Sequence, residues 1–210
     1  MYFVKTPFWL KKLFNAYTWD IKTSEKILYL TFDDGPHPVA TPFVLNELDK
    51  YNAKATFFCL GKNVIQHPDI YKELLLKGHA VGNHTHNHLN GWKVNVSDYI
   101  ANVREASRYI QSSFFRPPYG RISKKQGQAL KKDQYSIIMW DVLSGDFNLK
   151  LSPENCLKNV TLKAAPGSVV VFHDSQKAFK NLSYALPKIL EYFDNWGFIF
   201  NPIETGVIVT

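Results

Sequence analysis

Two adjacent carboxylates, Asp33 and Asp34, stand where an apolar strand pattern ends. Residues 26–30 alternate in the way typical of a strand, and Gly35 and Pro36 then turn the chain. Side chains alternate along a strand, so the two carboxylates can take different roles. A turn of this composition could also simply solvate its charges. Residues elsewhere in the chain must decide between these interpretations.

Three histidines, His84, His86 and His88, follow a second short strand pattern. Two imidazoles and one carboxylate form a common ligand set for catalytic zinc, with the fourth position open for water. If this segment is extended, all three rings share a face; if it opens a helix, only the first and third do. The glycine and asparagines before it favour a turn into a helix. We therefore predict Asp34, His84 and His88 as metal ligands and His86 as a bystander.

The carboxylate that binds no metal is suited to act as a base. Asp33 can take a proton from water, and Arg116 can keep it ionised and oriented through a charge-assisted hydrogen bond. A tetrahedral intermediate also needs an oxyanion site. A metal ion would supply one half of it, and a backbone N–H at the turn of Tyr119 the other.

A leaving amine or alcohol needs an acid, and His173 at the end of a later strand pattern fits that role. Asp146 is predicted to orient it, with Asp141 as a nearby competitor. Together these residues predict metal-assisted hydrolysis of an acyl group.

Alternating strand and helix patterns must position these residues. Seven strands are predicted, at 26–30, 55–60, 79–82, 113–115, 135–140, 168–172 and 198–200. Continuous apolar strands separated by helices indicate a parallel sheet buried on both faces. The polar residues fall at the carboxyl ends of these strands, which converge on one face of an α/β barrel. We therefore expect an α/β fold, a distorted and incomplete (β/α) barrel of about seven parallel strands.

Five segments, in this order, resemble the motifs of the polysaccharide deacetylases, the NodB-homology group of carbohydrate esterase family four. They are residues 31–36, 84–88, 116–120, 140–147 and 169–174, and the resemblance extends over about residues 25–200. It implies a distorted seven-stranded barrel with one divalent metal ion, usually zinc and sometimes cobalt or nickel. It also implies removal of acetyl groups from N-acetylglucosamine in chitin or peptidoglycan, or from O-acetylated xylan.

Carried over by position, the resemblance gives each segment a role. It implies that Asp33 is the catalytic base, tuned by Arg116, and that Asp34, His84 and His88 bind the metal ion. It implies that His173 is the catalytic acid, tuned by Asp146. The backbone amide of Tyr119 would complete the oxyanion site, and Val171 would form part of the wall of the acetyl pocket. The fourth motif usually ends in Asp-Trp and here ends in Asp146-Phe147, which predicts a narrower groove wall. Trp92, just after the histidines, could stack on a sugar or serve in packing.

Other functions remain open at this stage. The same residues could hydrolyse an O-acetyl ester on xylan or another glycan. A non-catalytic glycan- or metal-binding module would be expected to lose Asp33 or His173, and both are retained. A different metal amidohydrolase would use His86, and not His88, as a ligand.

Composition sets the remaining expectations. The chain has 210 residues, a net charge of +7 and two cysteines, Cys59 and Cys156, each in a predicted buried element. Its lysines are scattered and accompany no nucleic-acid motif, so we expect a glycan as partner, no nucleic acid, and a monomer. Residues 1–24 are expected to pack as an arm on a domain of residues 25–210. No signal peptide or membrane span is visible, which favours the cytoplasm, whereas the resemblance favours the periplasm or the exterior.

Overall fold

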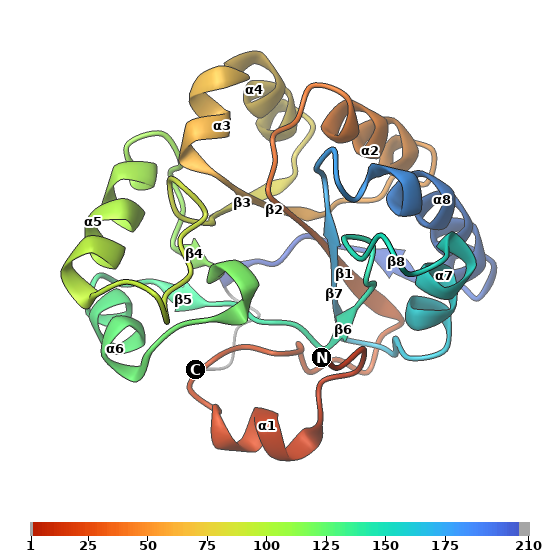
Figure 1. Cartoon of the computed structure of the whole chain (residues 1–210). Coiled ribbons are helices and arrows are strands. Elements are labelled where there is room, and N and C mark those ends of the chain that lie inside the picture. Colours follow the sequence, from red (N-terminus) through yellow and green to blue (C-terminus); the bar gives the residue numbers. More distant parts are fainter. Residues whose placement is uncertain (1, 206–210) are drawn as a thin grey trace.

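A parallel sheet curls into an incomplete barrel with helices around its outside (Figure 1). The computed structural model describes residues 2–205. Within them the sheet runs β5-β4-β3-β2-β1-β7-β6, and β8 pairs with the start of β1. The strands are β1 (Ile27–Asp33), β2 (Thr56–Cys59), β3 (Ala80–Asn83), β4 (Phe114–Phe115), β5 (Ser136–Ile137), β6 (Val142–Leu143), β7 (Val169–His173) and β8 (Ile199–Phe200). The predicted α/β class and incomplete barrel are confirmed.

Burial on both faces explains why the central strands are apolar throughout. Every residue of β1 is buried, and Phe32 stacks between Phe57 of β2 and Phe172 of β7, with ring centroids 5.0 and 5.8 Å apart. Such stacks fix the lateral register of neighbouring strands as well as burying area. The carboxyl end of β1 therefore lies between those of β2 and β7, and it carries Asp33.

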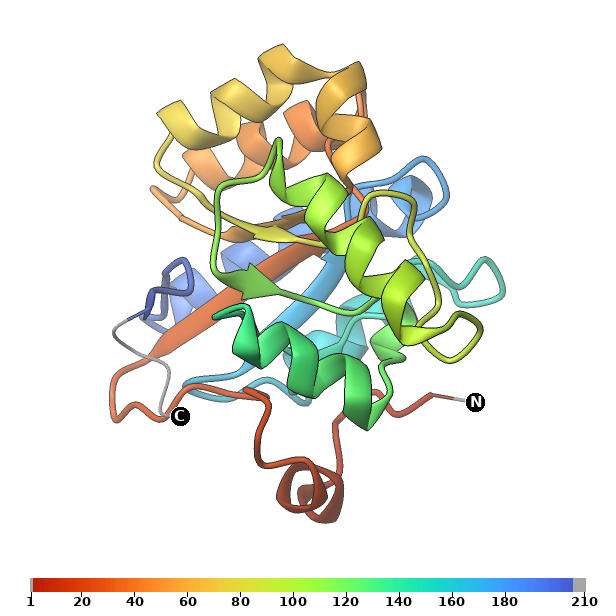
Figure 2. The same ribbon diagram turned by 90° about the vertical axis from the view of Figure 1, so that its left-hand side faces the viewer.

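The helices cover the outer face of the sheet, as Figures 1 and 2 show from two directions. Their apolar sides supply much of the core, α2 and α8 on one flank and α5 on another. The helices are α1 (Phe8–Leu13), α2 (Ala40–Asp49), α3 (Gly61–Gln66), α4 (Pro68–Leu76), α5 (Val96–Ser107), α6 (Lys124–Lys132), α7 (Pro153–Thr161) and α8 (Phe179–Asn195), with a 3-10 turn at Pro118–Gly120. None of the helices in the described part of the chain is long and apolar enough to span a membrane.

Two local expectations were wrong. The predicted strand at 135–140 is only β5, after which the chain crosses to the other edge of the sheet and forms β6. The histidine segment does not open a helix, because Thr85 and His88 have φ values of 67° and 59°, and helix α5 starts only at Val96. Left-handed residues of this kind make turns rather than helices. Cys59 and Cys156 are buried, as predicted, and both are free thiols.

The N-terminal residues run along the open side of the barrel, between its two edge strands. Lys5 forms an antiparallel bridge with Val142 of β6, and Thr18 a parallel bridge with Ile138, next to β5. The ammonium groups of Lys5 and Lys11 both contact the carboxylate of Asp141, each at 2.5 Å, and that side chain is 3% exposed. This segment thus contacts both edges that the barrel leaves unclosed.

Candidate active site

An open pocket with a volume of about 690 Å³ lies at the carboxyl edge of the sheet. The loops that follow β1, β3 and β7 form it, as expected for an α/β barrel. Predicted site residues that line it are Asp33, Asp34, His84, His88, Tyr119, Phe147, Val171 and His173. Residues as far apart as 33 and 173 therefore meet in one cavity.

Asp34, His84 and His88 form a compact group that could hold a metal ion. One ligand atom from each lies within 4.8 Å of the others. Oδ1 of Asp34 is 3.1 Å from Nε2 of His88 and 3.7 Å from Nε2 of His84. His86 points elsewhere: its Nδ1 lies 2.6 Å from where a Cβ on Gly61 would stand, and it does not line the pocket.

The donor atoms of this group have the chemistry that a divalent ion needs. Nδ1 of His84 lies 2.8 Å from the carbonyl of Arg116, which can only accept, so Nδ1 carries the proton and Nε2 presents a lone pair. Burial lowers the pKa of His84 to about 4, so the ring is neutral at pH 7. Oδ1 of Asp34 is buried without a hydrogen-bond partner among the described residues. Two imidazole nitrogens and an unpaired carboxylate oxygen fit zinc.

The charge on Asp34 suits the same role. Burial alone would raise the pKa of Asp34, but the imidazoles around it favour the carboxylate and leave that pKa below its ordinary value. Its backbone has a φ of 81°, and its carbonyl accepts a hydrogen bond of 2.7 Å from the Asn63 amide. The left-handed turn therefore aims Asp34 away from the direction of Asp33.

Asp33 is held by a fully buried arginine. Nη1 of Arg116 donates to Oδ1 of Asp33 at 2.7 Å and to the hydroxyl of Thr31 at the same distance. The remaining guanidinium donors reach the carbonyls of Ile138 and Met139, and Arg116 is 0% exposed. Burial lowers the pKa of Arg116, and the charge of Asp33 opposes that shift. The carboxylate of Asp33 therefore has a fixed position in the pocket.

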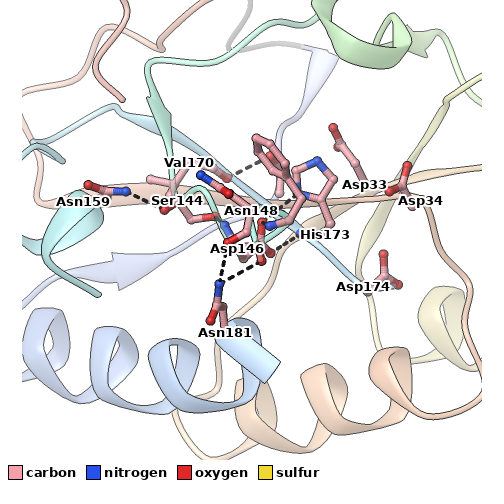
Figure 3. Close-up of polar contacts among 12 residues, drawn as sticks. Asp33, Asp34, Ser144, Asp146, Asn148, Asn159, Val170, His173, Asp174 and Asn181 are labelled. Atoms are coloured by element: carbon pink, nitrogen blue, oxygen red, sulfur yellow. Dashed lines mark hydrogen bonds and ion pairs between the residues drawn. The ribbon is translucent and has the colours of Figure 1, made fainter. Parts of the chain in front are cut away.

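His173, at the end of β7, is the register partner of Asp33 on the neighbouring strand β1, and it is paired with Asp146 (Figure 3). Its Nδ1 lies 2.8 Å from Oδ1 of Asp146, and its backbone N–H donates to Oδ2 at 2.7 Å. Burial would lower the pKa of His173, but the charge of Asp146 and the hydrogen bond to it outweigh burial and raise that pKa to about 9. The imidazole therefore carries a proton at neutral pH. Asp141, the competing candidate, lies instead against Lys5 and Lys11.

Of the predicted substrate-binding residues, Tyr119 and Phe147 line the pocket and Trp92 does not. Tyr119 has a φ of 60°, and its ring centroid is 4.5 Å from that of His88. Phe147 packs against His173 with centroids 5.1 Å apart. Trp92 is 64% exposed, lies outside the residues that line the pocket, and contacts Arg121, whose guanidinium is 4.2 Å from its ring centre. Its part in sugar binding stays a prediction.

Two positioning residues were missed from the sequence. Asp174 is fully buried, accepts the backbone N–H of Gly35 at 3.0 Å and the hydroxyl of Thr41, and so fixes the turn after the two carboxylates. Burial raises the pKa of Asp174 to about 8. The side chain of Asn102 accepts the backbone N–H of His86 and of Asn87, each at 3.0 Å, and holds the histidine turn. Only the position of Asp174 directly after His173 was a signal in the sequence.

Fold and site together define the general class of this chain. An open parallel barrel with carboxylates, histidines and three candidate metal ligands at its carboxyl edge is the architecture of an α/β-barrel hydrolase. Residues 20–138 match the family model described as polysaccharide deacetylase.

Known proteins similar to this chain agree with that match. A peptidoglycan-N-acetylglucosamine deacetylase of Bacillus cereus is 35% identical over 81% of this chain and 63% of its own length. A second protein of that name and organism is 33% identical over 87% of this chain and 89% of its own length. The crystal structure of a peptidoglycan N-acetylglucosamine deacetylase bound to 4-naphthalen-1-yl-N-oxidanyl-benzamide superimposes with a TM-score of 0.83 and 32% identity, covering 94% of this chain and 95% of the other.

The chain therefore belongs to the polysaccharide deacetylase family. The family and the deacetylase class of enzyme, both predicted from the five segments, are confirmed. The chain spans slightly less than two thirds of one of these relatives and most of the other.

Proposed function

We propose that this protein is a metal-dependent hydrolase that removes acetyl groups from N-acetylglucosamine residues of a glycan, with peptidoglycan or chitin-type oligosaccharides as the substrate class. The observation that carries the proposal is the pocket that holds Asp33 beside the Asp34, His84 and His88 group, with a protonated His173 at the neighbouring position of β7. The names of the similar proteins support N-acetylglucosamine as the sugar.

Amide hydrolysis needs both a base and an acid, and the site offers one of each. Asp33, fixed by Arg116, takes a proton from the attacking water. The sugar nitrogen cannot leave as an anion, so it must be protonated as the carbon–nitrogen bond breaks. His173 can donate that proton from Nε2, since its Nδ1 is held by Asp146. The products are acetate and the free amine.

The metal ligands in this scheme are Asp34, His84 and His88. A divalent ion held there, with zinc as the first choice and cobalt or nickel as alternatives, would supply Lewis-acid polarisation of the acetyl carbonyl and a more acidic water. The backbone N–H of Tyr119 is the proposed second donor to the developing oxyanion. Val171 and Leu143 line the same pocket and would surround the acetyl methyl group with apolar surface.

Acetate release tests the proposed reaction. The protein with added zinc or cobalt would be assayed on N-acetylated chito-oligosaccharides, peptidoglycan and acetylxylan, beside Asp33→Asn and the control Asp20→Asn. We expect release from the first two substrates, loss of about a hundredfold or more in Asp33→Asn, and an unchanged rate in the control. Release from acetylxylan alone would identify an O-acetyl esterase. No release from any glycan, with the metal site full, would refute the proposed activity.

Metal binding tests the ligand set separately from catalysis. Titration calorimetry with zinc would compare His84→Ala, His88→Ala and His86→Ala. We expect the first two to weaken binding by at least a hundredfold and the third by less than tenfold, because His86 faces Gly61 rather than Asp34. Strong weakening in His86→Ala with little effect in His88→Ala would favour the alternative ligand set.

A further inference from the structure

The first described residues of the chain reach the wall of the catalytic pocket. Tyr2 lines the cavity together with Asp33, His173 and Phe147, although it lies in the N-terminal segment. Figure 2 shows the chain start on the side where the loops after the strands also lie. Tyr2 is 37% exposed and lines the cavity, so part of its surface is free to contact a bound molecule.

Several contacts fix this segment on the barrel. Leu143 of β6 donates its backbone N–H to the carbonyl of Val4, and Thr6 donates to the carbonyl of Asp141, both at 2.8 Å. The Thr6 hydroxyl also donates to the Trp140 carbonyl at 2.7 Å. The ion pairs of two lysines with buried Asp141 add to this ladder. Tyr2 is thus two residues from a backbone ladder, and its position is defined.

The ring of Tyr2 extends an aromatic surface that begins at the proposed acid. Its centroid lies 5.3 Å from that of Phe147, and Phe147 in turn packs on the His173 ring at 5.1 Å. The Tyr2 hydroxyl accepts a hydrogen bond of 3.1 Å from the Asn148 side chain, so its own proton remains available to another acceptor. The order from the catalytic centre outwards is therefore His173, Phe147, Tyr2.

We infer that Tyr2 and Phe147 form the aromatic side of a subsite for a second sugar ring, next to the ring that loses its acetyl group. The inference rests on the proposed function, because His173 must lie beside the nitrogen of the reacting sugar. A neighbouring pyranose would then lie over Phe147 and Tyr2. The apolar face of a pyranose packs well on aromatic rings, and the Tyr2 hydroxyl can donate to a sugar oxygen. Tyr2 supplies a second ring beside Phe147.

Chain-length dependence of catalysis tests this subsite. Tyr2→Ala, Tyr2→Phe and the control Phe3→Ala, which changes an exposed neighbour outside the pocket, would be assayed on chito-oligosaccharides of two to five sugars and on 4-nitrophenyl acetate. We expect Tyr2→Ala to lower kcat/KM on oligosaccharides of two or more sugars by roughly three- to tenfold, through KM, and to change the rate on the small ester, which has no second sugar, much less. Tyr2→Phe should retain most of the activity, and Phe3→Ala all of it.

Binding to an inactive background separates this inference from the proposed function. Calorimetry with chitotetraose would compare Asp33→Asn with Asp33→Asn/Tyr2→Ala, and thermal unfolding would check that both are folded. A Kd that is three- to tenfold higher in the double variant supports the subsite, even if the parent protein releases no acetate from any glycan. Equal affinity and equal kcat/KM at every chain length would overturn it. A faster Tyr2→Ala enzyme on long substrates would also overturn it, since Tyr2 would then obstruct the groove.

Discussion

Replacing Asp146 by asparagine isolates the charge that keeps His173 protonated. Three donors now face the two carboxylate oxygens: the Nδ1–H and the backbone N–H of His173, and the backbone N–H of Phe147, which shares Oδ1 with the ring. Asparagine has nearly the same shape but offers one acceptor and one donor group. Either the backbone N–H or the ring must lose its partner, unless the ring gives up its Nδ1 proton and accepts from the new amide. The substitution therefore favours the neutral imidazole of His173 for two reasons: the negative charge beside the ring is lost, and a donor group replaces one of the two acceptors.

The expected magnitude follows from the pKa. A pKa of His173 of about 9, against an ordinary value of 6.5, corresponds to roughly 3 kcal/mol in favour of the protonated folded state. This stabilisation is fully present below pH 6.5, where the unfolded chain is also protonated, and is lost as the pH rises through 9. Asp146→Asn should therefore lower the free energy of unfolding by roughly 3 kcal/mol at pH 6 and by much less at pH 10.

Two measurements on the metal-free protein check this reasoning. NMR titration of the imidazole should place the pKa of His173 near 9 in the parent and below the ordinary value in Asp146→Asn, where only the charges of Asp34 and Asp33 still oppose burial. Urea unfolding at pH 6 and pH 10 should show the predicted difference in stability. Asp133→Asn, which breaks an exposed pair with Arg104, is the matched control and should cost less than 1 kcal/mol at either pH. An equal loss at both pH values in Asp146→Asn would refute the argument.

Three further substitutions test other parts of the structure. Arg116→Met leaves the buried carboxylate of Asp33 unpaired and should lower the free energy of unfolding, measured in urea, by about 3–5 kcal/mol. The double variant Arg116→Met/Asp33→Asn has no unpaired charge at this place and should be more stable than Arg116→Met. Gly35→Ala would put a Cβ 2.0 Å from Oδ2 of Asp174, so we expect a loss of at least about 1–3 kcal/mol and weaker zinc binding by calorimetry. His79 is buried, and burial lowers its pKa to about 4. The free energy of unfolding should therefore fall by up to roughly 3 kcal/mol as the pH drops from 6.5 to 4. In His79→Asn, thermal unfolding should depend less on pH over this range.

Each of these has its own control and contrary result. Arg104→Met removes an exposed arginine and should cost under about 1 kcal/mol; a similar cost in Arg116→Met would contradict the argument from burial. Gly78→Ala meets open space and should show only the cost of its positive φ, about 1–2 kcal/mol, without any effect on zinc affinity. Equal zinc binding in Gly35→Ala would show that Asp174 does not fix the ligand turn. In His79→Asn the amide oxygen can still accept from Ala55, so an unchanged pH dependence would assign the acid sensitivity to other groups.

Patterns local in the sequence predicted the fold class and most of the pocket. Apolar strands followed directly by Asp33, His84, Arg116 and His173 sufficed, because the carboxyl ends of parallel strands converge whatever the detailed path between them. His84 and His88 were predicted to lie together on one face of a helix. The segment is not helical, but its left-handed turn also brings the Nε2 atoms of both rings towards Asp34.

Long-range hydrogen bonds were not predictable from one sequence. The partners of Asp174 are Gly35 and Thr41, more than 130 residues away, and no periodicity connects them. Strand β6 has two residues, too few to show a pattern, and the sheet edge rather than the sequence defines it. Tyr2 was missed because an aromatic residue in a segment without any motif gives no sign of the wall that it reaches.

The pairing of the N-terminal segment with both β5 and β6 bears on solubility. An incomplete barrel has two exposed strand edges, and free N–H and C=O groups on such edges recruit strands of other molecules. Bridges at Lys5 and Thr18 occupy backbone groups beside both edges with one continuous piece of the same chain. Anchoring on Asp141 keeps that piece in place through two ion pairs. The segment therefore covers strand edges that could otherwise pair with another molecule. A shortened chain without it would expose those edges and leave the buried Asp141 without its two lysine partners.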